Sequence, residues 1–195
     1  MFSGIVQAKG KVISDISSLG IKKITVEAPK DWLFKDGESV AIDGICSTVI
    51  SSSNNQFTVQ YMPETLKKTT ANNFYSESVL NLEKSLKMGE SIDGHFVYGH
   101  IDALSIVTKI KKDGESKVIS FSLGKDIEKY LAYKGSVTIN GVSLTISNIS
   151  KKDFEVSLIP YTLENTNLGN LKTGDAVNIE TDILARYVER IINHK

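Results

Sequence analysis

A short segment that occurs twice limits the possible folds of this chain more than any other feature. Residues 139–145 read INGVSLT, and residues 42–48 read IDGICST. The same spacing of 97 residues aligns Pro63 with Pro160 and residues 80–83 with residues 177–180. One constant spacing over several separate segments indicates an internal duplication.

Upstream of the repeated segment the spacing falls from 97 to 95 residues. Gly4-Ile5 aligns with Gly99-His100, and Lys30-Asp31 aligns with Lys125-Asp126. Two residues were therefore added in a connection of the second copy, which is where chains accept insertions most readily. The 195 residues then divide into two related domains, each large enough to bury its own core.

Charge and composition exclude several classes of function. The chain has 23 basic and 23 acidic residues, so a nucleic-acid partner is not expected. The first residues lack the features of a signal peptide, and no apolar run approaches 18 residues. We expect a cytoplasmic protein with no membrane association. The single cysteine, Cys46, excludes an internal disulfide, and one cysteine with three histidines gives no recognisable metal-ligand spacing.

Each half of the chain reads as six short strands separated by turn residues. In the first half the expected strands are residues 4–13, 21–27, 38–42, 46–51, 57–61 and 79–83. In the second half they are residues 98–110, 117–123, 136–139, 143–149, 154–159 and 176–180. Six strands in about 85 residues favour a small closed or nearly closed antiparallel barrel, because closure removes exposed strand edges.

Two helices are expected outside this strand pattern. Residues 125–133 carry apolar side chains at helical spacing, and the simplest interpretation is a cover for the barrel core. Asp182 can cap a second helix over residues 183–192, whose apolar face is wide for the end of a chain. That face can dock on its own barrel, but we favour an oligomer contact.

Several side chains can carry chemistry. If residues 94–102 form a strand, His95 and His100 point to opposite faces. Asp102 then lies on the same face as His100 and can orient it or stabilise its charge. The simpler interpretation of each histidine is a hydrogen-bonded residue at a strand end. Cys46 aligns with Ser143, and each has a threonine two residues later, Thr48 and Thr145. These four can line related pockets, although Cys46 alone is typical of a buried, small apolar side chain.

The motifs together resemble one known family. The first six residues MFSGIV, residues 94–102 reading GHFVYGHID, the segment NGVSLT and the paired PETL and PYTL runs are similar to riboflavin synthase of the α-chain type, which has two lumazine-binding repeats. The resemblance implies an all-β fold of two tandem six-stranded Greek-key barrels with a C-terminal helix. The expected domains are residues 1–89, residues 90–181 and a helix at residues 182–195.

The resemblance also implies a reaction and a set of partners. One 6,7-dimethyl-8-ribityllumazine gives a four-carbon unit to a second, which yields riboflavin and 5-amino-6-ribitylamino-uracil. No cofactor and no metal are expected. A homotrimer with sites shared between subunits is expected, and lumazine synthase is a candidate partner.

The site residues follow from the matching motifs. Positions linked to activity are Phe2, Ser39, Cys46, His100 and Ser143, with His100 as the candidate acid or base. The first pocket is expected to use Gly4, Ile5, Val6, Cys46, Ser47, Thr48, Gln60, Tyr61, Met62, Pro63, Glu64 and Thr65. The second is expected to use Gly99, His100, Ile101, Lys134, Ser143, Leu144, Thr145, Ser157, Leu158, Ile159, Pro160, Tyr161 and Thr162.

Three positions depart from the family pattern, and two other functions compete with synthesis. Ser47 stands where leucine is usual, Ser3 where threonine is usual and Tyr161 where glutamate is common, which affects affinity more than fold. The first alternative is a non-catalytic lumazine- or flavin-binding antenna on the same duplicated barrel. The second is a flavin reductase barrel, but the glycine-rich nucleotide-binding domain of that class is missing from the sequence.

Overall fold

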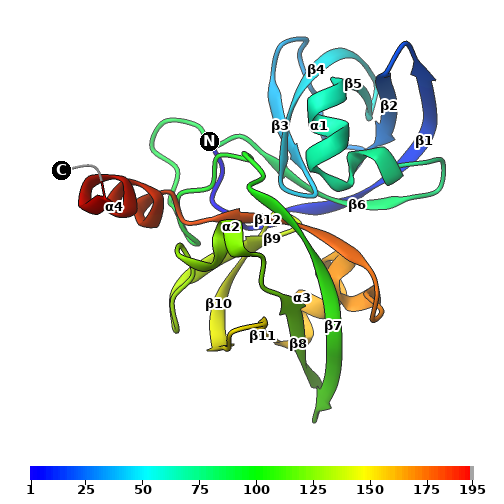
Figure 1. Cartoon of the computed structure of the whole chain (residues 1–195). Helices are drawn as coiled ribbons and strands as arrows, with labels where there is room; N and C mark the ends of the chain where they lie inside the picture. Colours follow the sequence, from blue (N-terminus) through cyan, green and yellow to red (C-terminus); the bar gives the residue numbers. More distant parts are fainter. Residues whose placement is uncertain (194–195) are drawn as a thin grey trace.

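The computed structural model describes residues 1–193, which form two closed six-stranded barrels followed by a helix (Figure 1). The first barrel has the strand order β1-β2-β5-β4-β3-β6, and every neighbouring pair is antiparallel. Its elements are β1 (Ala8–Ser18), β2 (Ile21–Glu27), β3 (Ser39–Ile42), β4 (Ile45–Ser53), β5 (Gln56–Tyr61), α1 (Pro63–Lys68), η1 (Thr70–Asn73) and β6 (Val79–Lys84).

The second barrel repeats this order with equivalent strands, β7-β8-β11-β10-β9-β12 around the closed sheet. Its elements are β7 (Ala103–Asp113), β8 (Ser116–Ser122), α2 (Lys125–Glu128), β9 (Ser136–Ile139), β10 (Val142–Ile149), β11 (Asp153–Leu158), α3 (Pro160–Asn165), η2 (Asn167–Asn170) and β12 (Ala176–Thr181). Strands β7 and β8 begin 95 residues after β1 and β2, and strands β9, β11 and β12 begin 97 residues after β3, β5 and β6. The duplication and its two-residue insertion are confirmed.

Each barrel contains a Greek key. The spatial order β6-β3-β4-β5 places the fourth strand of the set beside the first, and β12-β9-β10-β11 repeats it. Irregular register lies between Val12 and Ser14 in β1 and at the equivalent position of β7, between Val107 and Lys109. Such bulges bend a strand and let a short sheet close on itself.

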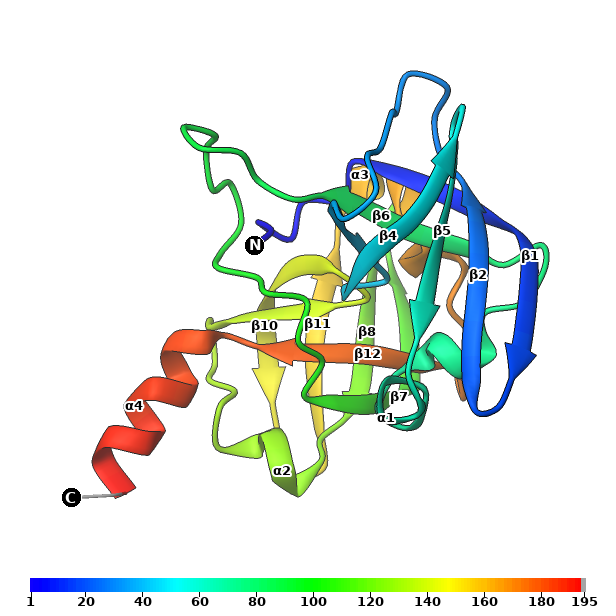
Figure 2. The same cartoon turned by 90° about the horizontal axis from the view of Figure 1, so that it is seen from above.

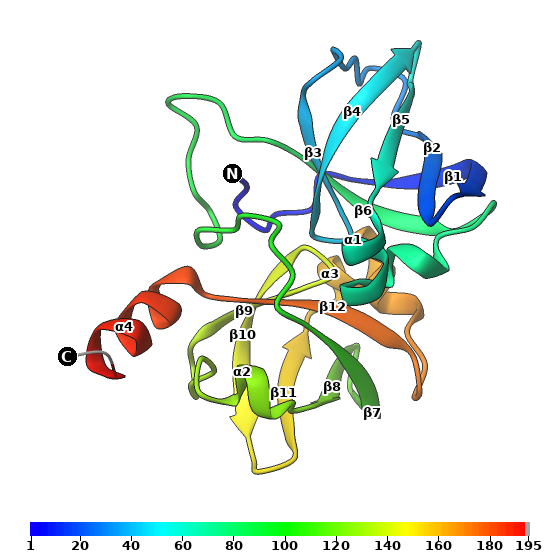
Figure 3. The same cartoon turned by 45° about the horizontal axis from the view of Figure 1, so that its top comes forward.

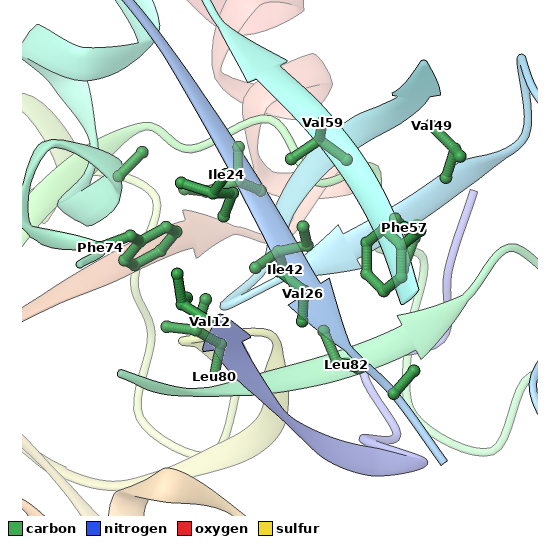
Figure 4. Packing of buried hydrophobic residues seen from close by; sticks show 14 of the residues in the cluster. Val12, Ile24, Val26, Ile42, Val49, Phe57, Val59, Phe74, Leu80 and Leu82 are labelled. Carbon is green, nitrogen blue, oxygen red and sulfur yellow. The ribbon is translucent and has the colours of Figure 1, made fainter. Parts of the chain in front are cut away.

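The first core lies inside its barrel, because alternate residues of the strands point inward. In β2, Ile24 and Val26 are fully buried, and in β5 Phe57 and Val59 meet them from the neighbouring strand. Figure 4 shows these side chains converging with Ile42, Val49 and Leu82 between the strands. In these strands the alternation of apolar and polar residues in the sequence therefore predicts correctly which side chains point into the barrel.

The ends of the two barrels are closed differently. In the first barrel, the connection between β2 and β3 brings Trp32 and Phe34 against the core. In the second, α2 and the turn after it place Ile127 and Leu131 there. The predicted helix over residues 125–133 is present but shorter, and its role as a cover for the core is confirmed.

Two segments predicted as strands are irregular. The first arm, residues 2–7, precedes β1, and the second arm, residues 97–102, precedes β7. Gly4 and Gly99 have φ of +79° and +74°, which no extended strand contains. The predicted strand starts at residues 4 and 98 were therefore wrong, because strands β1 and β7 begin at Ala8 and Ala103.

The barrels meet along an approximate two-fold axis. A Cβ added at Gly44 would lie 2.7 Å from the backbone nitrogen of Gly141, and one at Gly141 would lie 2.8 Å from that of Gly44. Asn81 donates to the Asn140 carbonyl oxygen at 2.9 Å, and Asn178 donates to the Asp43 carbonyl oxygen at 2.9 Å. The two turns of the repeated segment are thus the contact between the domains, and only glycine permits their approach.

Helix α4 (Ile183–Asn193) extends beyond the end of β12, as Figures 2 and 3 show from two directions, and its Glu189 pairs with Lys129 of the second barrel. The backbone N–H of Leu184 donates to the Asp182 carboxylate at 2.9 Å, so the predicted cap is present. The apolar side chains of this helix that lie 55–65% exposed are Leu184, Tyr187, Val188, Ile191 and Ile192. Residues 194–195 of the predicted helical domain lie outside the described residues. Within residues 1–193, no helix has the length and apolarity needed to cross a membrane.

Candidate active site

The two arms cross each other, and each one then runs along the other barrel. They meet at an antiparallel bridge between Phe2 and Val97, where the Phe2 N–H donates to the Val97 carbonyl oxygen at 2.7 Å. Beyond the crossing, the carbonyl oxygen of Gly4 accepts the N–H of Ser143 in the second barrel at 2.7 Å. The carbonyl oxygen of Gly99 accepts the N–H of Cys46 in the first barrel at 2.9 Å.

Packing confirms that each arm lies on the other barrel. Val6 of the first arm packs against the core of the second barrel, and Ile101 of the second arm packs against the core of the first. A Cβ added at Gly99 would lie 2.6 Å from the nitrogen of Cys46, and one at Gly4 would lie 2.7 Å from the Cβ of Ser143. The arms therefore lie directly on the strands that carry the two predicted reactive side chains.

This exchange corrects the predicted composition of the two pockets. The sequence prediction placed residues 4–6 with Cys46 and residues 99–101 with Ser143. The structure pairs them the other way. The Cys46 site is therefore built from residues 99–101, Cys46 and α1, and the Ser143 site from residues 4–6, Ser143 and the segment before the second arm.

The Cys46 site contains a cavity of about 280 Å³. Strand β4 supplies Cys46, helix α1 supplies Glu64 and Thr65, and the second arm supplies His100. The remaining lining residues are Ile45, Lys68, Thr69, Gly99 and Ile101. Lys68 donates to the Glu64 carboxylate at 2.8 Å, so this wall carries a charge pair. The cavity brings together a thiol, an imidazole and hydroxyl groups over an apolar floor.

Cys46 reaches the surface of this cavity, so its interpretation as a buried apolar residue was wrong. In β4 the neighbours Ile45 and Ser47 point into the barrel, and Cys46 and Thr48 point outward. Nearby protein atoms displace part of the solvent and raise the pKa of the thiol, against the opposing effects of the Met1 ammonium charge and a hydrogen bond with Ser39. The thiol form predominates at neutral pH, and Cys46 acts more readily as a hydrogen-bonding group than as a thiolate nucleophile.

His100 lies in this cavity on the second arm, and its ring is 5.9 Å from that of Tyr98. Asp102 does not orient it. The Asp102 carboxylate accepts the N–H and hydroxyl of Thr181 at 2.8 Å each and pairs with Arg186 at 3.0 Å. Residues 97–102 do not form a strand, so the prediction that Asp102 and His100 lie on the same strand face was wrong. His100 lines the cavity and stays a candidate acid or base.

The Ser143 site has a different set of polar groups. The Ser143 hydroxyl is 2.8 Å from Nδ1 of His95, and Nε2 of His95 is 3.2 Å from the hydroxyl of Thr138. Partial burial lowers the pKa of His95, while the charge of Asp182 opposes that shift. A neutral His95 can accept a proton from Ser143 or orient its hydroxyl. The two histidines thus serve different sites.

The outward threonines and Lys134 border these sites. Thr48 and Thr145 are exposed two residues beyond Cys46 and Ser143, as the strand period predicts. The Lys134 N–H donates to the carbonyl oxygen of Ile146, which places this residue beside the end of the Ser143–Thr145 segment. Lys134 has φ +65°, where the first barrel has Gly37. A lysine held in this costly conformation suggests a role for its charge beyond that of a solvated turn residue.

Other predicted site residues are buried inside the barrels. Ser47, Tyr61 and Leu158 are 3% exposed or less, and the Ser47 hydroxyl lies 3.0 Å from the Tyr61 hydroxyl. Their side chains cannot touch a ligand on the outer face, so only their backbone can. Phe2 is also fully buried; it packs with Ala41, which pairs with Cys46 between β3 and β4. We therefore treat Phe2 as a support for the Cys46 strand.

The remaining predicted residues lie at the ends of the fifth strands and in the helices that follow. Their side chains are exposed or partly buried, so they can contact a ligand at the surface, with Tyr161 72% exposed. They are Gln60, Met62 and Pro63 in the first barrel, and Ser157, Ile159, Pro160 and Thr162 in the second. Leu144 is partly buried against the second core.

Sequence reasoning assigned three residues that build the sites to neither pocket. His95 contacts Ser143, and Glu83 and Glu180 bind the two arms. The Glu83 carboxylate accepts the N–H of Ser3 at 2.7 Å and that of Gly4 at 3.1 Å. Glu180 accepts the N–H of Tyr98 at 2.7 Å and that of Gly99 at 2.9 Å. The signal was available for the two glutamates, because they align in the duplication and stand at the same position of equivalent strands.

Fold and sites together define a class of protein. Two like barrels each present one hydroxyl or thiol outward beside a glycine arm from the other barrel. Backbone groups, hydroxyls and a cavity with an apolar floor suit polar heterocyclic molecules. The chain is a tandem-barrel protein with two related candidate sites, one in each barrel.

Comparisons with known proteins agree with this class and narrow it. The family model of the lumazine binding domain matches residues 3–85 and 98–182. Riboflavin synthase of Actinobacillus pleuropneumoniae is 36% identical over 198 residues, covering 100% of this chain and 91% of the relative. That of Bacillus subtilis (strain 168) is 35% identical over 196 residues, covering 99% and 90%. The chain therefore belongs to the riboflavin synthase family.

Solved structures support the same relationship. LumP complexed with 6,7-dimethyl-8-(1'-D-ribityl) lumazine has a TM-score of 0.84 and 26% sequence identity, over 93% of this chain and 99% of that chain. LumP complexed with riboflavin has a TM-score of 0.86 at the same identity and coverage.

Proposed function

We propose that this chain is a riboflavin synthase, which converts two molecules of 6,7-dimethyl-8-ribityllumazine into riboflavin and 5-amino-6-ribitylamino-uracil. The observation that carries the proposal is that the two sites share one backbone arrangement but present different reactive side chains. Each site has the same arm, glycine and glutamate, but the first presents Cys46 with His100 and the second presents Ser143 with His95. A dismutation needs this arrangement, because two identical molecules must play different roles.

The residues around each site can supply the required steps. Transfer of four carbons needs a proton removed from a methyl group of one molecule and a nucleophile added to the ring of the other. His100, facing the cavity, is the proposed acid or base, and Cys46 and Ser39 assist by hydrogen bonding. At the other site His95 and Ser143 form a pair in which the imidazole accepts the hydroxyl proton. The two substrates together supply all transferred atoms, so no external oxidant is needed.

We propose that a complete site joins the Cys46 site of one subunit to the Ser143 site of another. The cavity of about 280 Å³ lies just below the range of ~300–1,000 Å³ typical of small-molecule sites, so two stacked ligands need a second surface. The apolar face of α4, with Tyr187 63% exposed and Ile191 63% exposed, supports assembly of several copies. A homotrimer is the proposed state, to be tested by light scattering.

The domain limits are also kept as a proposal: residues 1–89, residues 90–181 and a helix from residue 182. Each arm belongs to the barrel that follows it in sequence, although it contacts the other one. Association with lumazine synthase stays a prediction, which co-purification of the two proteins can test. A cytoplasmic location fits the free, exposed thiol of Cys46, since reducing compartments keep thiols unpaired.

The test of function uses the lumazine as the only substrate. Purified protein incubated with 6,7-dimethyl-8-ribityllumazine should produce riboflavin, followed by its visible absorption, with one riboflavin per two lumazines consumed. Chromatography should detect 5-amino-6-ribitylamino-uracil in equal amount. Tight binding of the lumazine without any riboflavin would instead establish the antenna function.

A further inference from the structure

The buried glutamates at the ends of β6 and β12 bind mainly the backbone N–H groups of the arms. Glu180 is 3% exposed, and its two oxygens accept the consecutive N–H groups of Tyr98 and Gly99, with the His100 N–H as a further donor. Glu83 is 2% exposed and accepts the N–H groups of Ser3 and Gly4 and the hydroxyl of Ser3. Burial of a carboxylate is costly unless such donors surround it.

The position of Glu180 links it directly to the Cys46 site. It binds the two residues that precede His100 in the chain, and the carbonyl oxygen of one of them, Gly99, accepts the Cys46 N–H at 2.9 Å. Gly99 and His100 both line the cavity. The placement of the imidazole over the cavity therefore depends on a carboxylate outside it.

We propose that Glu180 and Glu83 are positioning residues for the reaction: Glu180 holds His100 and the second arm over Cys46, and Glu83 holds the first arm over Ser143. The predicted effect on kcat rests on the proposed function. The predicted effect on the position of the arms does not depend on activity. Each glutamate acts on the site of the other barrel, so substitution at the end of β12 alters chemistry at the first barrel. Burial raises the pKa of both carboxyl groups, and that of Glu180 rises to about 7. This direction is expected for carboxyl groups that the protein encloses.

The single thiol of the chain gives a direct test. Glu180→Gln keeps the shape of the side chain but replaces one acceptor oxygen by a donor that faces backbone N–H groups. The second arm should loosen, and Cys46 should react with a disulfide reagent such as dithiobis-nitrobenzoate roughly tenfold faster. Glu83→Gln is the matched control. It loosens the other arm, which covers Ser143, and should raise Cys46 reactivity clearly less than Glu180→Gln does.

Turnover supplies the second measurement. In Glu180→Gln, kcat for riboflavin formation should fall about 10- to 100-fold while the dissociation constant for the lumazine changes much less, because a displaced imidazole affects the chemical step most. Thermal unfolding of both variants should be recorded, because a Tm close to that of the wild-type chain shows that faster reaction of Cys46 comes from the arm and not from general unfolding.

Two results would overturn the inference. One is equal Cys46 reactivity in Glu180→Gln and Glu83→Gln, and the other is unchanged kcat in a Glu180→Gln protein whose thiol is more accessible. If the wild-type chain forms no riboflavin, the proposed function fails, while the difference in thiol reactivity still decides whether Glu180 holds the second arm.

Discussion

The two barrels share a construction and differ at the residues that face a ligand. Strand order, bulges, arm glycines and arm-binding glutamates are the same in both. The differences are Cys46 against Ser143 and, on the arms, His100 against Ile5. The comparison teaches that the duplicated backbone is a common holder for two similar molecules, and that the distinction between their roles lies in a few side chains.

A second set of differences lies inside the protein. The first barrel has the hydrogen-bonded pair Ser47 and Tyr61 where the second has Leu144 and Leu158, so the buried Ser47 hydroxyl has a partner hydroxyl. At the contact between the domains, buried Asp43 stands where the second copy has Asn140. Single substitutions at these positions can therefore remove a difference between the two barrels or introduce one.

The largest effect is expected at His100. His100→Gln should lower kcat by roughly 10²- to 10⁴-fold, the range for loss of a general acid or base, with lumazine binding retained. Ile5→Gln, the equivalent position on the first arm, is the matched control and should keep kcat within about tenfold. Steady-state riboflavin formation measures both. Turnover near the wild-type value in His100→Gln would remove the assigned role.

The contact between the domains should be the next most sensitive place. Gly44→Ala adds a methyl group 2.7 Å from the Gly141 nitrogen at φ +77° and should cost about 3 kcal/mol or more. Gly37→Ala, at φ +88° with open space around it, isolates the backbone strain and should cost only about 1–2 kcal/mol. Chemical denaturation measures the difference. Equal losses would show that the domains do not press on each other at this turn.

Asp43→Asn should stabilise the protein in a pH-dependent way. Burial raises the pKa of Asp43 to about 7, so between pH 4 and 7 the folded chain keeps a proton that the unfolded chain releases. Stability from this group therefore falls as pH rises through that window. The variant should match wild type near pH 4 and exceed it by on the order of 2–4 kcal/mol at pH 8.

The reverse substitution is its control. Asn140→Asp places a second carboxyl group at the equivalent turn and should destabilise the protein, more strongly at pH 8 than at pH 5. Unfolding by urea at several pH values gives both slopes. A gain from Asp43→Asn that is constant with pH would contradict the assigned titration.

The smallest effect is expected in the barrel interior. Tyr61→Phe removes the partner of the Ser47 hydroxyl, which still donates to the Ile45 carbonyl oxygen at 3.0 Å, so the cost should be about 1 kcal/mol. Tyr75→Phe, at an exposed position, should change stability by less than about 0.5 kcal/mol. Denaturation midpoints compare the two. No difference between them would mean that the Ser47–Tyr61 contact adds nothing to the first barrel.

Much of the fold followed from local patterns. The strand predicted at residues 136–139 matches β9, and the alternation in β4 placed Cys46 and Thr48 on one face. The arms were mistaken for strands because their apolar residues resemble strand residues. Gly4 and Gly99 have positive φ, and distant carboxylates bind their N–H groups. These features depend on contacts between residues far apart in the sequence, so a short segment does not predict them.

The sequence by itself determined the duplication, the alternation of buried and outward residues in strands such as β2, β5 and β11, the C-terminal helix and the family. Only the tertiary structure decided which arm serves which barrel. Because the two copies carry the same glycine, an arm is equally compatible with its own barrel and with the other. The choice comes from the crossing at Phe2 and Val97 and from long-range hydrogen bonds, such as those of Gly4 with Ser143 and of Gly99 with Cys46. The repeat in the sequence is the same for either pairing, so it does not predict these bonds.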